Sequence, residues 1–411
     1  MRVSTLLASA AITAAGWTAA SAQDVTFYYD KSGWDEGFAA LIEGASEASG
    51  LDIAGQQQTP TDRYQAYIMS SIAGGATPAI FTWWNGKQLD SLVETGEIAD
   101  LTALWDEAIE AGWFSEAERE LFSVDGTPYA IPLNVARWPV LYNKDAFEAA
   151  GIEQPPQSWD ELIAAADALK EAGYVPFNAP AVGGWMGFIW FSELMIRTDP
   201  DAFVGLTDGS VPYDGPEVQR AMEIWTDFYE RGYFTDAREQ DETRFMVNEE
   251  AAMYLIGEWT AGILANRGME PGEQIGAFLL PPIDAETENS VIVEAAPIVF
   301  SADAMEEMPA LMDAARYLMS PEAGNALGAA NGIYSGNLMT DAPNAIVSDV
   351  NAIIAEDAPR SIVRWWEAVP PELQGDLVSQ MNAFMLDPTE ENAQRVMDDM
   401  QALNESYWAF Q

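Results

Sequence analysis

Two patterns of apolar residues alternate along the first part of the chain. Short apolar runs lie at 24–29, 51–54 and 79–82, and between them apolar residues recur every three to four positions over 34–45 and 61–72. A short run is typical of a buried strand, and the three-to-four-residue spacing is typical of an amphipathic helix. Strands that alternate with helices in this order predict an α/β fold with a parallel sheet.

The same two patterns continue through the rest of the chain. Extended segments are expected at 129–134 and 140–145, and buried strands at 252–256 and 276–280. The sequence Ser158-Trp159-Asp160-Glu161 predicts a capping box at the start of a helix. Further helices are expected over 162–169, 218–229 and 310–319, from Pro321 onward, and over 393–403.

The first 22 residues have the features of a cleavable signal peptide. Arg2 supplies a positive start, an apolar stretch covers 6–15, and Ala20-Ser21-Ala22 is a small-residue cleavage pattern before Gln23. The apolar stretch is too short to span a bilayer, and charges or prolines interrupt every later one. We therefore expect an exported protein without stable membrane insertion.

Length and missing residue types narrow the class of protein. A chain of 411 residues is longer than one hydrophobic core usually serves, so two lobes are expected. Without cysteine the fold depends on a large core, and no lipid-modified cysteine can anchor it, which favours the periplasm of a bacterium with two membranes. Without histidine, His-based triads and most zinc sites are excluded, and we expect no metal site and no cofactor.

The net charge is extreme, with 66 acidic and 18 basic residues and a formal charge of -48. Such a surface argues against nucleic acid and anionic membranes as partners. Because the acidic residues are scattered, we interpret them as a solvated, self-repelling surface suited to salty surroundings. The alternative is a binding site for a polycation.

The sequence Thr82-Trp83-Trp84-Asn85-Gly86 joins a predicted strand to a predicted helix. Ligands of α/β proteins bind in loops beyond the carboxyl ends of strands. Adjacent tryptophans at a strand end point to opposite sides, so one belongs to the core. We assign Trp84 to the ligand and keep Trp83 as a further ligand-binding candidate. Asn85 either offers a hydrogen-bonding edge beside Trp84 or caps the following helix.

Polar and aromatic residues also follow the first two predicted strands. Asp30 and Trp34 come after the first strand, and Asp62 and Arg63 stand at the start of the second helix. Thr61 and Asp62 are good N-cap residues, and Asp30 could equally cap the helix that follows it. Ligand contact and helix capping stay open for Asp30 and Asp62.

Candidate residues in the middle of the chain form three groups. Asn134, Arg137 and Trp138 follow an extended segment, where Arg137 either pairs with an acidic residue, which we slightly favour, or holds a ligand. Trp185 stands among glycines that leave its ring accessible. Glu258 and Trp259 follow a buried strand, and a weaker candidate is Glu294.

Arg360, Arg364, Trp365 and Trp366 form the largest basic and aromatic cluster of this acidic chain. We assign Arg360 and Trp365 to a ligand, while the alternative is local charge neutralisation with a tryptophan in the core. Aromatic faces together with planar polar groups suit a neutral ligand rich in hydroxyl groups. Trp225, at helical spacing with other apolar residues, is expected in the core.

The chain resembles the extracellular solute-binding proteins of carbohydrate ABC transporters, the maltose-binding-protein-like group. The resemblance covers nearly all of the mature chain and is carried by AGGATPAIFTWWNG, GTPYAIPLNVARWPVLYNKDAFEAAGI, PPQSWDELIAAADAL, EAAMYLIGEWTAG, DAARYLMSPEAGNALGAANGIYSGN and WWEAVPPELQGDL. It implies a two-lobed periplasmic binding protein fold, in which each lobe is a central β-sheet flanked by helices. It also implies that Trp259 occupies a ligand-stacking position.

In such proteins the chain crosses the hinge several times, which here implies crossings near 132–134, 280–282 and 337–345. The implied N-terminal lobe comprises 23–132 and 281–337, and the C-terminal lobe comprises 133–280 and 338–411. The implied function is the capture of a sugar or small oligosaccharide between the lobes by a monomer without catalysis, which then docks on a membrane ABC permease. The alternatives are a secreted glycoside-active enzyme and a binding protein for a polyamine or a metal ion.

Overall fold

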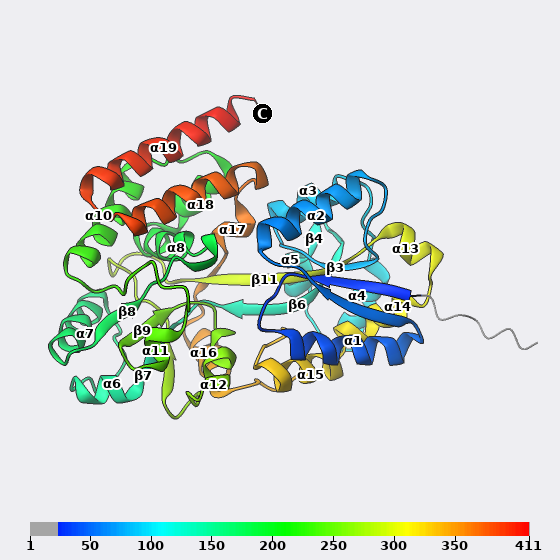
Figure 1. The fold of residues 1–411 in the computed structure, drawn as a ribbon, viewed down its shortest axis with the longest axis horizontal. Coiled ribbons are helices and arrows are strands. Elements are labelled where there is room, and N and C mark those ends of the chain that lie inside the picture. The colour runs from blue at the N-terminus through cyan, green and yellow to red at the C-terminus, as the bar shows by residue number, and fades with distance from the viewer. Residues whose placement is uncertain (1–23, 411) are drawn as a thin grey trace, which may run out of the picture.

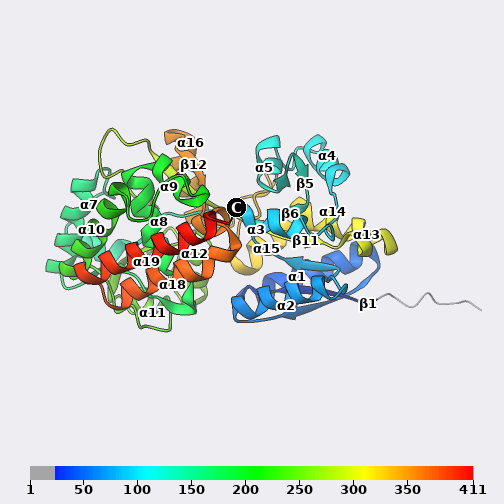
Figure 2. The same cartoon turned by 90° about the horizontal axis from the view of Figure 1, so that it is seen from above.

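A computed structural model describes residues 24–410, so the predicted signal peptide at 1–22 lies outside the described residues. Figure 1 shows two groups of helices and strands, with two long strands, β6 (Ala130–Arg137) and β11 (Ser290–Phe300), running from one group to the other. The view from above in Figure 2 shows the two groups side by side. The predicted two-lobed α/β fold is confirmed.

The larger sheet has six strands in the order β12-β11-β3-β1-β2, and β6 pairs with the other side of β11. Strands β1, β2 and β3 lie in the first group, whereas β12 pairs with the start of β11 and lies in the second group (Figure 2). Strand β1 runs parallel to β2 and β3, as the alternation of strands and helices predicts. Strand β11 is antiparallel to β3 and β6 and parallel to β12. The remaining bounds are β1 (Asp24–Tyr29), β2 (Asp52–Gln57), β3 (Ile80–Thr82) and β12 (Arg360–Val363).

The second group is built on a four-stranded sheet with the order β10-β7-β9-β8. Strands β10, β7 and β9 are antiparallel neighbours, and β8 is parallel to β9. Every residue of β9 is buried, as its continuous apolar run predicts. The bounds are β7 (Val140–Asn143), β8 (Val175–Asn178), β9 (Ala251–Leu255) and β10 (Ile275–Phe278), and a separate hairpin joins β4 (Ser123–Val124) to β5 (Thr127–Pro128).

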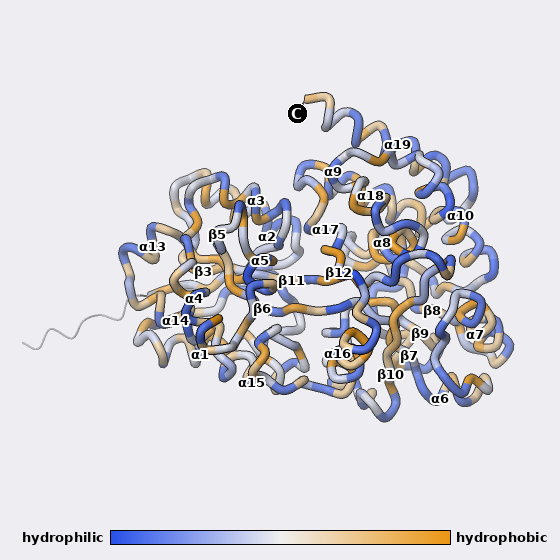
Figure 3. Tube along the Cα trace, turned by 180° about the vertical axis from the view of Figure 1, so that it is seen from behind, coloured by the Kyte–Doolittle hydropathy of each residue, from blue (hydrophilic) through white to orange (hydrophobic). Residues whose placement is uncertain are grey.

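Helices cover both sheets and turn polar residues outward. Figure 3 shows apolar residues along β7 and β10, with more polar residues on the helices around them. Around the first sheet lie α1 (Asp35–Ser49), α2 (Thr61–Ala73), α3 (Lys87–Val93), α4 (Thr102–Glu110), α5 (Glu116–Leu121), α13 (Ala302–Glu307), α14 (Leu311–Met319) and α15 (Pro321–Asn331). None of the helices within residues 24–410 combines the length and the apolar character needed to cross a bilayer.

The second group contains most of the remaining helices. Helices α8, α10, α18 and α19 pack against one another, and Trp225 of α10 is fully buried among them, as predicted. The bounds are α6 (Lys144–Ala149), α7 (Trp159–Glu171), the 3-10 turn η1 (Val182–Gly184), α8 (Gly187–Thr198), α9 (Pro200–Asp208), α10 (Pro216–Glu230), α11 (Arg244–Val247), α12 (Thr260–Asn266), α16 (Ala345–Asp357), α18 (Pro371–Leu386) and α19 (Glu390–Trp408). The short helix α17 (Trp365–Ala368) follows β12.

The predicted helix caps are only partly confirmed. Ser158 accepts a hydrogen bond from the Glu161 amide, as predicted, but the Glu161 carboxylate accepts from the amide of Gln157 and not from that of Ser158. The prediction that Thr61 or Asp62 caps α2 is wrong, because Pro60 is the N-cap and no side chain makes a cap bond there. The Thr61 hydroxyl instead donates a hydrogen bond to the Asp30 carboxylate.

Candidate functional site

A cavity of about 170 Å³ lies where the two groups meet. Residues of the loops after β1 and β3 form one side, and residues at the starts of α8 and α12 form the other. Residues of β11 and α17 lie between them. The lining residues are Asp30, Lys31, Ser32, Trp34, Thr61, Trp84, Trp185, Phe188, Glu242, Trp259, Ile263, Glu294, Arg364 and Trp366.

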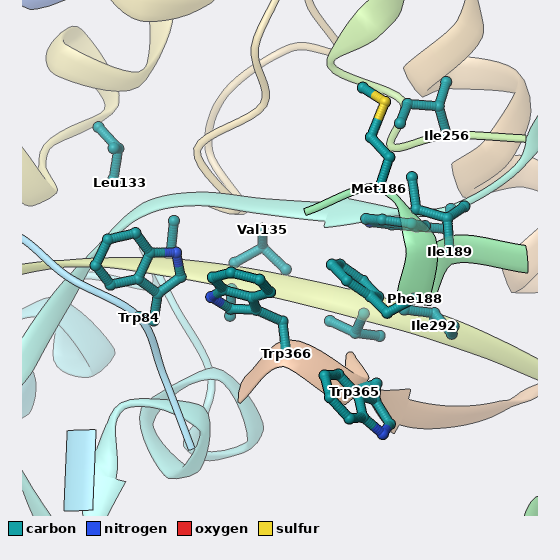
Figure 4. Packing of buried hydrophobic residues seen from close by; sticks show 14 of the residues in the cluster. Trp84, Leu133, Val135, Met186, Phe188, Ile189, Ile256, Ile292, Trp365 and Trp366 are labelled. Atoms are coloured by element: carbon teal, nitrogen blue, oxygen red, sulfur yellow. The ribbon is translucent and has the colours of Figure 1, made fainter. Parts of the chain in front are cut away.

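Aromatic rings dominate the walls of this cavity. Trp34, at the start of α1, meets Trp259, at the start of α12, edge to face with ring centroids 6.4 Å apart. These two side chains belong to different groups, so they join the two sides of the cavity. Figure 4 shows the rings of Trp84, Trp366 and Phe188 following one another along β11. The cavity thus offers flat apolar surfaces from several directions.

Glu294 of β11 carries the main acceptor of the cavity. Its Oε2 accepts hydrogen bonds from the indole nitrogens of Trp138, at 3.2 Å, and Trp259, at 3.1 Å. Glu294 pairs with Ala136 across the two strands, and Trp138 follows the end of β6 two residues after Ala136, close enough to reach the same carboxylate. The other oxygen, Oε1, makes no hydrogen bond to a described residue, although Glu294 lines the cavity. One oxygen of Glu294 is therefore held by the protein, and the other makes no hydrogen bond to a described residue.

Arg364 supplies the positive charge that Glu294 needs when it is buried. Its guanidinium lies 2.9 Å from Glu294 Oε2, and its Nε donates to Glu367 Oε2 at 2.8 Å. Burial alone lowers the pKa of Arg364, but the two carboxylates outweigh burial and raise it. The carbonyl oxygen of Glu367 occupies the space that a Cβ atom at position 86 would need. Only glycine therefore fits at Gly86, two residues after Trp84.

Asp30 is held in place by the end of the first sheet. Its carboxylate accepts hydrogen bonds from the hydroxyls of Thr61, at 3.2 Å, and Thr82, at 3.4 Å. The ammonium of Lys31 lies 3.4 Å from Asp30 Oδ1 and 5.2 Å from the centroid of the Trp84 ring. Neither α1 nor α2 is capped by Asp30, so the alternative of a helix cap is wrong.

Five of the predicted ligand-binding residues line the cavity. They come from four separate segments of the chain, which the fold brings together, and they are Asp30, Trp34, Trp84, Trp185 and Trp259. That each contacts a ligand stays a prediction.

The neighbours of Trp84 do not line the cavity. Trp83 points to the other side, as expected for adjacent residues, and its indole nitrogen donates to the Gln88 carbonyl at 3.0 Å. Asn85 is buried without capping α3, whose N-cap is Gly86. Trp84 therefore lines the cavity as assigned, whereas the further candidates Trp83 and Asn85 are buried outside it.

Asp62 and Arg63 are placed outside the cavity. Both are exposed on the first turn of α2, while Thr61 lines the cavity. The helical rotation after Thr61 turns the next two side chains toward solvent. The sequence predicts that α2 begins after a cap at Thr61 or Asp62. In the structure Pro60 is the N-cap, and Thr61 is the first helical residue and the one that lines the cavity.

Asn134 in β6 and Trp138 directly after it are fully buried and do not line the cavity. Trp138 acts on it indirectly through its bond to Glu294. Arg137 is close enough to the buried Glu258 for their charges to interact, but its Nε and Nη1 make no hydrogen bond to a described residue, so the favoured ion pair does not form, and neither residue lines the cavity. Both carboxylate oxygens of Glu258 lack a hydrogen bond among the described residues.

The cavity is lined by other residues of the basic and aromatic cluster at 360–366 than the two that were assigned to a ligand. Arg364 and Trp366 line the cavity, whereas Arg360 pairs with Asp201 and Glu288 at the surface. Trp365 is fully buried and donates to the Tyr213 hydroxyl at 3.3 Å. Arg360 is the first residue of β12 and Val363 is the last, so the whole length of the strand lies between Arg360 and the cavity residue Arg364.

Sequence reasoning missed six residues of the cavity. Lys31 and Ser32 directly follow Asp30, so the loop argument used for Asp30 could have found them. Glu242 is one of 66 acidic residues, and Phe188 and Ile263 look like core positions, so nothing in their patterns marks them. The missed residues are Lys31, Ser32, Thr61, Phe188, Glu242 and Ile263.

Glu258 gives the protein a predicted pH dependence. Burial raises its pKa from the ordinary 4.5 to about 8, against the opposing charge of Arg137 and with the support of Glu294. Between these values the folded protein holds a proton that the unfolded chain has lost, so stability falls as the pH rises through this window. The wild type loses stability at up to roughly 1.4 kcal/mol per pH unit in this window. We therefore expect the stability of Glu258→Gln relative to the wild type to rise by about 3.5 kcal/mol from pH 5 to pH 8.

Urea unfolding of both proteins at pH 5, 6.5 and 8 measures this difference. The exposed Glu171→Gln, which changes the net charge equally, serves as the control. A difference between Glu258→Gln and the wild type that is the same at all three pH values contradicts the prediction.

Comparison with known proteins gives a family match and a fold match. The family model of bacterial extracellular solute-binding proteins matches residues 40–352. An uncharacterized ABC transporter extracellular-binding protein of Pyrococcus horikoshii is 25% identical over 219 residues, which cover 52% of this chain and 49% of that protein. The sn-glycerol-3-phosphate-binding periplasmic protein of Pectobacterium atrosepticum is 27% identical over 186 residues, covering 44% and 39%. The matched segments thus span half or less of the length of these curated relatives.

Two solved structures share the fold over almost the whole chain. The bacterial solute receptor AcbH, described as preferring β-D-galactopyranose, has a TM-score of 0.82 at 20% identity and covers 94% of this chain and 99% of its own. A chitin oligosaccharide binding protein has a TM-score of 0.82 at 19% identity, with the same coverage.

Proposed function

The chain belongs to the family of bacterial extracellular solute-binding proteins, and we propose that it captures a sugar or small oligosaccharide for an ABC importer. The observation that carries the proposal is the cavity, in which tryptophan rings from both groups surround the free oxygen of Glu294. Tryptophan rings stack on the C–H faces of a sugar, and a carboxylate oxygen accepts hydrogen bonds from its hydroxyl groups. The solved structures described for galactopyranose and chitin oligosaccharide support the same class of ligand.

The proposed mechanism is closure of two lobes around the ligand. The proposed N-terminal lobe comprises 23–132 and 281–337, and the C-terminal lobe comprises 133–280 and 338–411. A ligand that touches Trp84 on one lobe and Trp259 on the other favours the closed state by its contacts with both. The closed form then docks on the membrane permease and delivers the ligand.

We further propose that the ligand is bound without chemical conversion. Glu294 Oε2 already accepts from two indoles and lies beside Arg364, which suits a fixed acceptor more than a group that exchanges protons with a substrate. The proposed protein is a monomer, exported to the periplasm, that does not bind nucleic acid. These parts of the proposal follow from the charge, the predicted signal peptide and the family.

A screen of solutes tests the proposal. Thermal unfolding is followed with monosaccharides, oligosaccharides, polyols, amino acids and polyamines, and each hit is confirmed by calorimetry. At a concentration of one hundred times its Kd, the native ligand is expected to stabilise the folded protein by about 2.7 kcal/mol. If a non-carbohydrate solute stabilises the protein and no sugar or polyol does, the carbohydrate function is wrong.

A further inference from the structure

We infer that the cavity selects a hydroxyl-rich ligand without an acidic group and rejects phosphate esters. This specificity depends on the proposed sugar function and narrows it to one class of ligand. This ligand preference would differ from that of the relatives named for sn-glycerol-3-phosphate. Those relatives are about as similar in sequence to this chain as the Pyrococcus horikoshii protein.

Both cations of the cavity are already paired with carboxylates. The lining includes two cationic side chains, Lys31 and Arg364, against three acidic ones, Asp30, Glu242 and Glu294. Lys31 lies 3.4 Å from Asp30, and Arg364 lies 2.9 Å from Glu294. Arg364 is also bound by Glu367 behind the cavity wall. A phosphate would have to compete with a carboxylate for each cation and then lie close to the carboxylate it displaced.

The spare charged groups of the cavity are carboxyl groups, and its buried unpaired donor, the Trp366 indole nitrogen, is neutral. The carboxyl of Glu242 makes no hydrogen bond or ion pair with a described residue, and Oε1 of Glu294 is also without one. Burial raises the pKa of Glu242, and nearby Asp241 adds to the rise, but neither protonation state supplies a positive charge. Two acceptors without donors of their own suit the hydroxyl groups of a sugar and repel an anion.

The helix starts on one side of the cavity, those of α1 and α2, carry carboxylates of their own, whereas the first turns of α8 and α12 on the other side carry none. Trp34 and Thr61 line the cavity at the starts of α1 and α2, where free backbone amides could bind a phosphate. However, the first turn of α1 carries Asp35 and Glu36, and that of α2 carries Asp62. These carboxylates already interact with the positive ends of the helix dipoles and oppose a further negative charge.

Calorimetry with matched ligands tests the inference. The ligands are glucose and glucose 6-phosphate, galactose and galactose 6-phosphate, glycerol 3-phosphate, and the neutral sugar that stabilises the protein most in the screen. We expect a neutral sugar to bind and every phosphorylated ligand to bind at least 100-fold more weakly than it does. A phosphate ester that binds as tightly as the best neutral sugar overturns the inference and leaves a carbohydrate function standing. If no carbohydrate binds, phosphorylated or not, the proposed function fails and the inference with it.

A charge reversal in the cavity provides a second test with its own control. Glu242→Lys adds an unpaired cation, so the affinity for glycerol 3-phosphate relative to the best neutral sugar is expected to rise at least about tenfold. Glu171→Lys makes the same charge change on an exposed position that does not line the cavity and is expected to alter the ratio less than about threefold. An unchanged ratio in Glu242→Lys contradicts the role of paired charges in the selection.

Discussion

Arg364→Leu is expected to lower the free energy of unfolding by about 3 to 5 kcal/mol, because it leaves two buried carboxylates without their cation. The side chains of Glu294 and Glu367 are only 5% and 1% exposed, and both lie within 3 Å of the Arg364 guanidinium. Leucine keeps part of the arginine packing, so the loss measures mainly the uncompensated charge. Urea unfolding at constant pH gives the difference.

Two further variants separate charge from packing. Arg360→Leu removes an arginine four residues earlier, whose pairs with Asp201 and Glu288 are exposed, and should cost less than about 1 kcal/mol. Adding Glu367→Gln to Arg364→Leu removes one of the orphaned charges and should recover part of the loss. An Arg364→Leu protein as stable as the wild type would show that Arg364 does not compensate these carboxylates.

The first sheet illustrates what the pattern of apolar residues can predict. Strands β1, β2 and β3 and the helices between them were all expected, because each one has a single clear period. Strand β11 was not recognised as a strand, although it is the longest strand of the described residues. Glu294 and Pro297 interrupt its apolar run, and the partners that accommodate them, Arg364 and a register shift against β6, come from distant parts of the chain.

The site shows a similar division. Trp84 and Trp259 could be predicted because each follows a strand, and such loops gather at one edge of a sheet. Choosing between Arg360 and Arg364, or between Trp365 and Trp366, required knowing where β12 ends, and element ends are poorly marked in sequence. The role of Trp138 in holding Glu294 depends on the pairing of β6 with β11, which local spacing does not reveal.

Trp84→Ala is expected to weaken binding of the sugar found in the screen by about 30- to 1,000-fold, or roughly 2 to 4 kcal/mol, as for a buried aromatic anchor. The Trp84 ring lines the cavity while its edges pack against Tyr64 and Trp83, with centroids 6.1 and 5.1 Å away. Because of this packing, the alanine variant should lose some stability as well as affinity. Calorimetry well below the unfolding temperature of the variant separates the two effects.

The adjacent tryptophans provide a matched pair of substitutions for this separation. Trp84→Phe shortens the stacking surface and should weaken binding at least about tenfold, less than alanine does. Trp83→Phe makes the same chemical change on the core side, where it breaks the bond to the Gln88 carbonyl, and should reduce stability with less than about a threefold change in Kd. If Trp84→Ala keeps its affinity within threefold of the wild type, the sugar does not stack on Trp84. Equal losses of affinity at both positions would mean that the pair acts through packing, since only Trp84 reaches the cavity.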